Sequence, residues 1–247
     1  MSKFHVDPDA RAAFPLVRVI RPRAGLAALV VIALGLVVAT AQADALKPVA
    51  PSDLCVTNGE LTPLPDGRIG VDTASSRAVL TSIGPQAVEI RFTFIGRSTR
   101  TKPLASGELR QQIGIKLRAA DTCNLVYAMW RIAPDSRVAV SVKRNPGQST
   151  HEQCGAQGYD NLKPTESGSP PPITPGTSHV LRAELSGTTL TVTADGARAW
   201  SGDLGARIAG LDGPVGLRTD NARFAFAYLA AKAADAPIRP CARTADD

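Results

Sequence analysis

Apolar and polar residues alternate through the middle of this chain. Apolar side chains fall at every second position in 112–118, and this period of two predicts a β-strand with one packed face and one solvated face. The segment 124–132 is apolar on both faces, which is typical of a central strand. A Pro-led turn follows at 133–136, and the alternation resumes in 138–143. The pattern predicts an antiparallel meander of three strands.

The same alternation marks strands on both sides of this meander. It is clearest at 88–95, and Asp195 and Gly196 form a strong hairpin signal. Asp220 and Asn221 are expected to shape a turn before the last strand. About ten or more short strands with almost no helical pattern predict an all-β sandwich or barrel. Further strands are expected at 54–57, 68–71, 78–81, 179–185, 188–193, 197–200, 215–218 and 223–229.

The N-terminal residues have the features of an export signal. Three arginines precede an apolar run at 24–39, and a small-x-small sequence follows at 41–43. The alternative is an uncleaved single-span anchor, because the run approaches the ~20 residues that span a bilayer. The expected organisation is a signal or anchor at 1–43, a linker at 44–52, one β-sandwich domain at 53–241 and a loose tail at 242–247.

The charge of the expected mature chain is modest. The whole chain has 28 Lys and Arg and 22 Asp and Glu, of which five basic and two acidic residues lie in the first 43. The remainder has a net charge of +3, which is too small to indicate nucleic-acid binding. The membrane is an expected partner only through an uncleaved N-terminal segment. We expect a secreted or periplasmic, cell-envelope protein, or alternatively one held by a single N-terminal span.

Four cysteines follow the apolar run, and an even number in an exported chain predicts two disulfides. Cys55 and Cys241 bracket the domain, and the ends of a domain often lie close together. Cys123 begins the central strand, and Cys154 follows the neighbouring antiparallel strand. The favoured pairing of the three possible ones is therefore Cys55 with Cys241 and Cys123 with Cys154.

Metal and cofactor binding have little support in the sequence. His151, Glu152 and Cys154 are close together, but the chain has three histidines and no Cys-x-x-Cys motif. Glycine loops that cradle phosphate are absent as well. We expect no metal and no cofactor.

Three C-terminal segments follow a recognisable order. The first, 190–200, contains a strand, an Asp-Gly hairpin and a tryptophan, the second, 213–221, contains Gly-x-x-Gly-Leu-Arg, and the third, 224–226, is an aromatic strand. In this order they resemble the concanavalin A-like lectin/glucanase superfamily, and most closely its laminin G-like and keto-disaccharide-hydrolase-like members. The resemblance implies a two-sheet antiparallel jelly-roll β-sandwich. It implies little about chemistry, because the shared motifs are structural.

The functional motifs of that superfamily are mostly missing. No Glu-x-Asp-x-x-Glu sequence supplies the carboxylate pair of a retaining glycosidase, and no Gly-x-Ser-x-Gly sequence supplies a serine nucleophile. The acidic cluster of the metal-binding lectins is not matched either. The sequence leaves catalysis open but favours a non-enzymatic protein.

One set of side chains indicates a ligand. The faces opposite the apolar rows are basic, and aromatic residues lie on the strand between them. Arginine forks pair with carboxylate or sulfate, so a cationic groove with aromatic rings suits an acidic glycan. The alternative is a solvated sheet face, with Trp130 in the core. The predicted groove consists of Arg91, Lys116, Arg118, Tyr127, Trp130, Arg131 and Lys143.

Three functions remain open from the sequence. The first is a secreted, non-catalytic module that binds carbohydrate or a cell-envelope glycan, with a preference for acidic glycans. The second is a polysaccharide lyase or another glycan-active enzyme on the same fold, because 107–113 faintly resembles a strand of alginate lyases. The third is an envelope-associated interaction domain.

Overall fold

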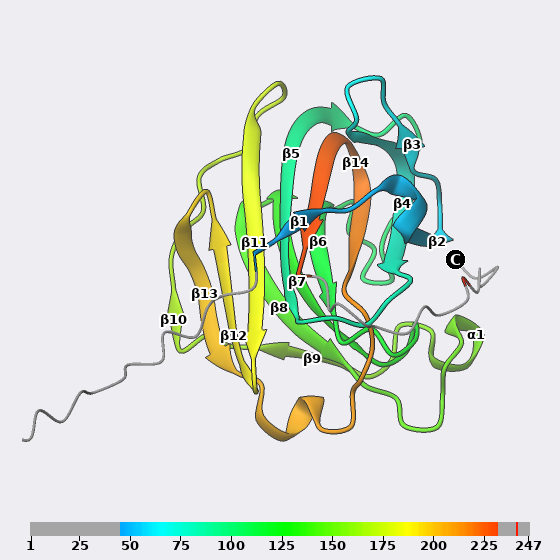
Figure 1. The fold of residues 1–247 in the computed structure, drawn as a ribbon, viewed down its shortest axis with the longest axis vertical. Coiled ribbons are helices and arrows are strands. Elements are labelled where there is room, and N and C mark those ends of the chain that lie inside the picture. The colour runs from blue at the N-terminus through cyan, green and yellow to red at the C-terminus, as the bar shows by residue number, and fades with distance from the viewer. Residues whose placement is uncertain (1–44, 232–240, 242–247) are drawn as a thin grey trace, which may run out of the picture. The chain divides into compact units, whose positions relative to one another are not determined.

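The computed structural model describes residues 45–231 and 241 (Figure 1). The expected export signal or anchor and the loose tail lie outside the described residues. The described chain is all-β with antiparallel pairing, as the sequence predicts. The first strands are β1 (Lys47–Pro48), β2 (Leu54–Asn58), β3 (Thr62–Pro63), β4 (Ile69–Leu80), β5 (Ala87–Arg97), β6 (Gln111–Leu117), β7 (Leu125–Ala133) and β8 (Arg137–Lys143). The others are β9 (Tyr159–Leu162), β10 (Glu166–Ser167), β11 (Ser178–Ser186), β12 (Thr189–Ala194), β13 (Ala197–Asp203) and β14 (Gly216–Ala230), and the short helices are η1 (Pro51–Asp53), α1 (His151–Cys154) and η2 (Gly205–Ile208).

The strands form one curled sheet rather than two separate ones. Its order is β10-β13-β12-β11-β5-β14-β6-β7-β8-β9, and β4 also pairs with β14. The two halves are joined because β14 pairs with β6 through Gly216–Asp220 and with β5 through Ala222–Ala230. Strand β14 therefore belongs to both halves of the fold (Figure 1).

Strands β4 and β14 are longer than the sequence predicts. The short pieces expected at 68–71 and 78–81 are parts of the single strand β4, and those at 215–218 and 223–229 are parts of β14. Pairing continues along both strands, from Gly216 opposite Val79 to Phe226 opposite Ile69. Polar residues interrupt the apolar pattern midway, so the sequence suggests a break where the backbone continues.

Asn221 lies where β14 changes partner. The turn predicted at this residue is a kink within β14, because Asn221 has a left-handed φ of 54° and is fully buried. Asparagine tolerates this conformation better than most residues. Its side-chain amide accepts a hydrogen bond from the Lys102 amide at 2.8 Å and donates to the carbonyls of Lys102 and Arg110 at 3.0 and 3.2 Å. The kink thus holds the loop between β5 and β6.

The core lies between the two halves of the sheet. Trp130 from β7 is fully buried and meets Phe92 edge-on, with ring centroids 5.7 Å apart. Phe92 packs in the same way against Phe224 of β14. These two aromatic contacts connect β7, β5 and β14. Along each strand, the core side chains alternate with side chains that face solvent or the pocket.

All four cysteines are paired, as Cys55–Cys241 and Cys123–Cys154, which is the pairing favoured by the sequence. Disulfides persist in oxidising compartments, so they indicate a location outside the cytoplasm. Within residues 45–231, no helix has the length and apolarity that crossing a bilayer requires.

The burial of Trp130 predicts a large loss of stability on substitution. Trp130→Ala should lower the free energy of unfolding by about 3–5 kcal/mol, because it removes a large side chain from a packed core. Urea denaturation measures this change. Leu109→Ala is the control, since Leu109 is 44% exposed and its loss should cost about 0.5 kcal/mol or less. Equal losses in the two variants would contradict the packing described.

Candidate functional site

The outer face of β4, β14, β6, β7 and β8 carries a grid of polar side chains. One row of the grid runs from Ser75 through Asp220 and Gln112 to Arg131, each opposite the next on a neighbouring strand. The adjacent row runs from Arg77 through Arg218 and Gly114 to Met129. These residues alternate with core residues because successive strand side chains point to opposite faces. The alternation that directs one set of side chains into the core therefore directs the other set, the polar grid, to the opposite face of the sheet.

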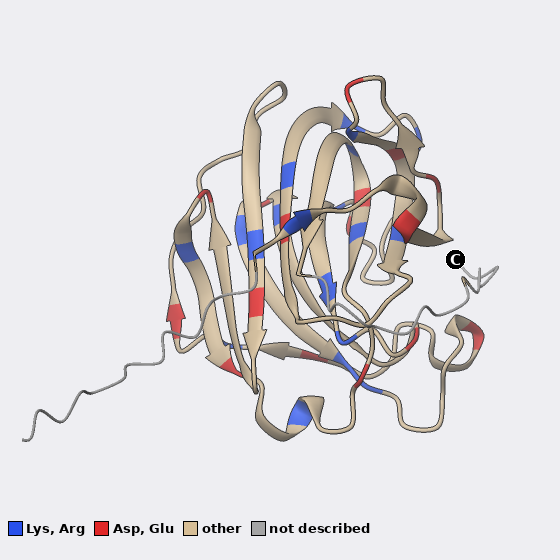
Figure 2. Ribbon diagram, viewed as in Figure 1, with Lys and Arg blue, Asp and Glu red and all other residues tan. Residues whose placement is uncertain are grey.

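A cavity of about 900 Å³ lies over this face. It is bordered by the loop between β5 and β6 and by the segment around α1. Basic side chains occur on strands throughout the fold (Figure 2), so overall charge does not locate a site. Among the described residues that line the cavity, however, six are cationic and two are acidic. The cations are Arg77, Arg100, Lys102, Arg110, Arg131 and Arg218, and the acids are Glu60 and Asp220.

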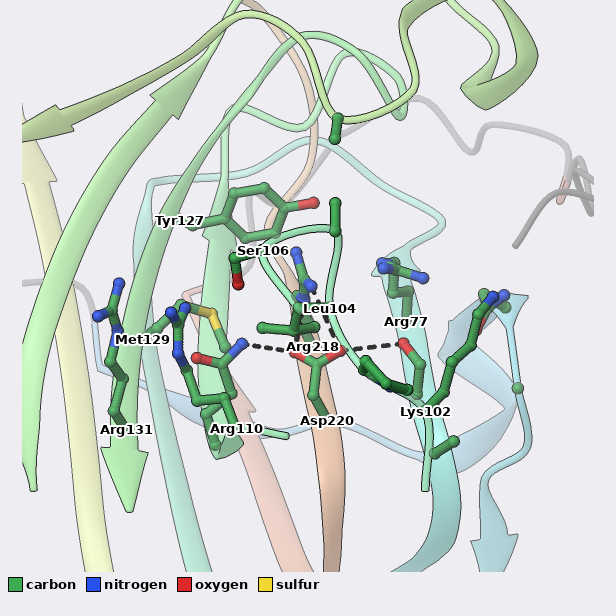
Figure 3. A pocket seen from close by; sticks show the side chains of 18 of the residues that line it. Arg77, Lys102, Leu104, Ser106, Arg110, Tyr127, Met129, Arg131, Arg218 and Asp220 are labelled. Carbon is green, nitrogen blue, oxygen red and sulfur yellow. Dashed lines mark hydrogen bonds and ion pairs between the residues drawn. The ribbon is translucent and has the colours of Figure 1, made fainter. Parts of the chain in front are cut away.

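Asp220 lies among these cations and is fully engaged (Figure 3). Its carboxylate accepts hydrogen bonds from Arg218 Nε at 2.8 Å, Gln112 Nε2 at 2.6 Å and Ser75 Oγ at 3.1 Å. Asp220 is 1% exposed, and its hydrogen bonds orient the side chains around it. Its bonds leave little capacity for a nucleophilic or basic role.

Two tyrosines form the aromatic part of the pocket. Tyr127 of β7 and Tyr159 of β9 are stacked, with centroids 6.1 Å apart and planes inclined by 22°. The Arg218 guanidinium lies 5.2 Å from the Tyr127 ring centre, within cation–π range. Tyr127 is buried, whereas Tyr159 is 39% exposed, and the Lys143 ammonium lies 5.3 Å from the Tyr159 ring centre. Burial, and then the neighbouring Tyr127, raises the pKa of Tyr159 to about 12, so its phenol stays protonated at neutral pH.

Two buried lysines lie beside the tyrosines and arginines of the pocket. Lys116 is opposite Tyr127 and is 2% exposed. Burial, and then the charges of Arg77, Arg218 and Lys143, holds the pKa of Lys116 well below its ordinary value. The Lys143 ammonium donates to the carbonyls of Gly155 at 2.7 Å and Thr122 at 3.1 Å. Burial, and then Arg77 and Arg218, lowers the pKa of Lys143 to about 8.

A second cationic group lies at the Arg131 side of the pocket. Burial, and then Arg110 and Arg137, lowers the pKa of Arg131 to about 10, with Glu108 acting in the opposite direction. Glu108 also forms an ion pair with Arg110. The Nε atoms of Arg110 and Arg131 and Oε1 of Gln112 are buried without a hydrogen-bond partner. These three atoms have unused hydrogen-bonding capacity.

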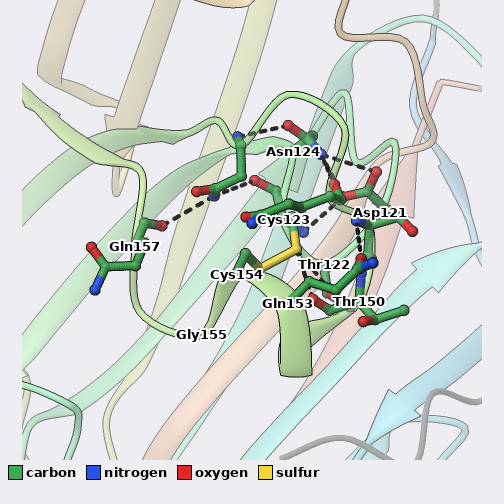
Figure 4. The surroundings of a disulfide bond; sticks show 12 residues. Asp121, Thr122, Cys123, Asn124, Thr150, Gln153, Cys154, Gly155 and Gln157 are labelled. Atoms are coloured by element: carbon green, nitrogen blue, oxygen red, sulfur yellow. Dashed lines mark hydrogen bonds between the residues drawn. A yellow bond between two sulfur atoms is a disulfide. The ribbon is translucent and has the colours of Figure 1, made fainter.

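The Cys123–Cys154 disulfide joins the start of β7 to the segment around α1 and lies within a network of hydrogen bonds (Figure 4). Asp121 accepts hydrogen bonds from the Cys123 amide and from the Asn124 side chain. Asn145 donates to the carbonyls of Cys123 and Gln157. The network fixes the segment that carries three pocket residues, His151, Gly155 and Ala156.

The structure brings together part of the predicted groove. Tyr127 and Arg131 line the pocket, and Lys116 and Lys143 interact electrostatically with its arginines. The others lie elsewhere. Trp130 is in the core, Arg91 is exposed on β5 and paired with Glu89, and Arg118 donates to the carbonyls of Leu211 and Gly187.

Several pocket residues were not predicted from the sequence. Arg77, Arg218 and Asp220 lie on strands whose middle parts do not alternate cleanly, and Arg110 lies in a connection. The Gly-Leu-Arg sequence that ends at Arg218 indicates a strand of the fold and not, by itself, a pocket residue. The described residues include no group of three or more His, Cys, Asp or Glu that could hold a metal.

Comparison with known proteins finds structural similarity only. No family model and no curated protein matches the chain. Among solved structures, the carbohydrate-binding module CBM66 from Bacillus subtilis is 15% identical, with a TM-score of 0.49 over 70% of this chain and 91% of that one. The metal-free Emp46p carbohydrate recognition domain is 12% identical, with a TM-score of 0.44 over 74% and 89%.

The galectin LEC-6 from Caenorhabditis elegans is 10% identical, with a TM-score of 0.37 over 74% of this chain and 99% of the galectin. The similarity concerns the arrangement of the strands. Function has to be derived from the side chains of this chain.

The lowered pKa of Lys143 predicts a dependence of stability on pH. The pKa is about 8 in the folded protein against an ordinary value of 10.5, so between these values the unfolded chain binds more protons. Stability should therefore rise with pH across this window. We expect this rise in the wild type, measured by urea denaturation from pH 7.5 to 10, and a smaller one in Lys143→Met. The same pH slope in both proteins would show that the Lys143 ammonium is not destabilised by folding.

The contacts of Asn221 predict that its side-chain hydrogen bonds anchor the loop between β5 and β6, separately from its effect on the backbone of β14. Asn221→Gly keeps the left-handed backbone accessible but removes the three amide hydrogen bonds. Asn221→Ala also strains the backbone and should be less stable than the glycine variant by about 1 kcal/mol. Hydrogen exchange should show faster exchange of the Lys102 amide in both variants. An equally protected Lys102 amide would mean that Asn221 does not anchor the loop.

Proposed function

We propose that the protein is an exported, non-catalytic module that binds an acidic glycan in the pocket over β4, β14, β6, β7 and β8. The observation that carries the proposal is the excess of cationic over acidic side chains in the pocket lining, six against two among the described residues. Asp220 is the one carboxylate of the described residues among the main groups that act on the buried Lys116, beside Arg77, Arg218 and Lys143. A negatively charged ligand would complete the charge balance.

The charge excess is costly for folding. Burying an ammonium among like charges is unfavourable unless opposite charge compensates it. An apolar side chain at position 116 would avoid this cost, because Lys116 neighbours Gly216 and Tyr127. The arrangement is therefore better explained by anion binding than by stability.

Other pocket residues suit a sugar. The exposed ring of Tyr159 can stack against the apolar face of a pyranose, in the way that Tyr presents an apolar body and a polar tip. Ser141, His151 and Asn161 line the same cavity and can exchange hydrogen bonds with hydroxyl groups. Arginine forks pair with carboxylate or sulfate groups in two-pronged geometry. Together these groups fit a glycan that carries acidic substituents.

The geometry supports binding more than catalysis. Asp220 accepts hydrogen bonds from three side chains, and the raised pKa of Tyr159 keeps its phenol protonated at neutral pH. Glycosidases of the common type need two carboxyl groups across the scissile bond. Within the described part of the pocket, Glu60 is the one further carboxylate.

A polysaccharide lyase is the second candidate. His151, Tyr159 and Arg218 all line the pocket, and such an enzyme requires a cation for the uronate carboxylate together with a proton-transfer group. Lyase action would create an unsaturated sugar, whereas binding alone would not. The paired cysteines support a site of action outside the cytoplasm for both candidates.

A polymer panel tests the proposal. The purified protein should bind polygalacturonate and should bind its fully methyl-esterified form at least about 10-fold more weakly, because esterification removes the charge and keeps the sugar. Affinity is measured by calorimetry, and absorbance of the mixture reports any unsaturated product. Equal binding of both polymers would contradict the acidic preference, and binding of neither would contradict the function. New absorbance would favour the lyase.

A further inference from the structure

The cations of the pocket form two electrostatically separate groups. The inner group comprises Arg77 and Arg218, with the buried Lys116 and Lys143, and each of its lysines is influenced by both arginines. The outer group comprises Arg110 and Arg131, with Arg137 nearby. The main charges acting on Arg131 belong to the outer group, and those acting on Lys116 belong to the inner group.

The two groups lie at opposite sides of the pocket. Arg131 is on β7, and β6 and β14 separate it from β4, which carries Arg77. Three steps of about 4.8 Å between neighbouring strands place these backbones roughly 14 Å apart. In Figure 3, Arg131 lies at one side of Asp220, and Arg77 and Lys102 lie at the other. This span exceeds the width of a single sugar ring.

Met129 is an apolar residue of the pocket lining and lies between Arg131 and Asp220 in Figure 3. Its neighbours across the sheet are Gly114 on β6 and then Arg218 on β14, which is paired with Asp220. A Cβ on Gly114 would lie 2.4 Å from the Met129 sulfur, so the glycine leaves space for the Met129 side chain. This apolar contact suits a sugar ring whose neighbours carry the charge.

The outer group also has unused hydrogen-bonding capacity. Gln112 is 2% exposed, and its Oε1 lacks a partner, as do Nε of Arg110 and of Arg131. Buried polar atoms are rarely left unsatisfied. The outer group is thus not fully satisfied by partners among the described residues.

We infer that the ligand is an oligomeric polyanion, a stretch of acidic glycan at least two to three sugars long, whose separate acidic groups contact the inner and the outer cations at the same time. This inference rests on the proposed function and specifies the ligand class. Two contacts joined by one chain raise affinity beyond that of either contact alone, provided that the spacing matches.

Calorimetry with galacturonic acid and its dimer, trimer and tetramer tests the inference. Affinity should rise by at least about 10-fold between the monomer and the longest oligomers. Arg131→Gln in the outer group and Arg77→Gln in the inner group should each lower tetramer affinity by about 10-fold. Arg91→Gln removes the same charge from the exposed side chain on β5 and should change nothing. Thermal melts of each variant show whether it is folded.

The outcomes separate the two proposals. The same affinity for monomer and tetramer, or a folded Arg131→Gln variant with unchanged tetramer binding, would overturn the two-group contact while leaving acidic-glycan binding intact. Absence of binding to every oligomer and to polygalacturonate would overturn the proposed function itself. An oligonucleotide that binds as tightly as the tetramer and responds equally to both substitutions would overturn a glycan as the ligand.

Discussion

The pairing of β14 with both halves of the sheet organises the molecule. Before Asn221 the strand lies beside β6 and directs Arg218 and Asp220 into the pocket, and after it the strand lies beside β5 and directs Phe224 into the core. A left-handed residue at the change of partner lets one strand serve both halves. The same residue holds Lys102 and the Arg110 carbonyl through its amide. Fold and pocket therefore depend on one kink.

The pocket keeps charge at the expense of stability. Lys116 and Lys143 are buried near Arg77 and Arg218, and burial holds both pKa values below their ordinary range. The core can tolerate this because aromatic contacts around Trp130 and two disulfides stabilise the surrounding sheet. Such a trade is common where a site must receive an anion, since preorganised cations need no rearrangement on binding.

The strand pattern made much of the fold predictable, and the site less so. The strands expected at 88–95, 112–118 and 124–132 correspond to β5, β6 and β7, because alternation there is uninterrupted. The continuity of β14 was not predictable, because Asp220 and Asn221 have the composition of a turn. Tyr127 and Arg131 were identified because they lie on a regular strand. Arg77 and Arg218 were missed because only long-range pairing brings them opposite each other.

The central claim is that the pocket over β4, β14, β6, β7 and β8 receives an acidic glycan. A crystal structure with bound tetragalacturonate tests it most directly. The account predicts carboxylate oxygens about 2.7–2.9 Å from guanidinium nitrogens in both the inner and the outer group, with a sugar ring over Met129. A tetrasaccharide bound on another face, with the pocket arginines free of it, would contradict the account.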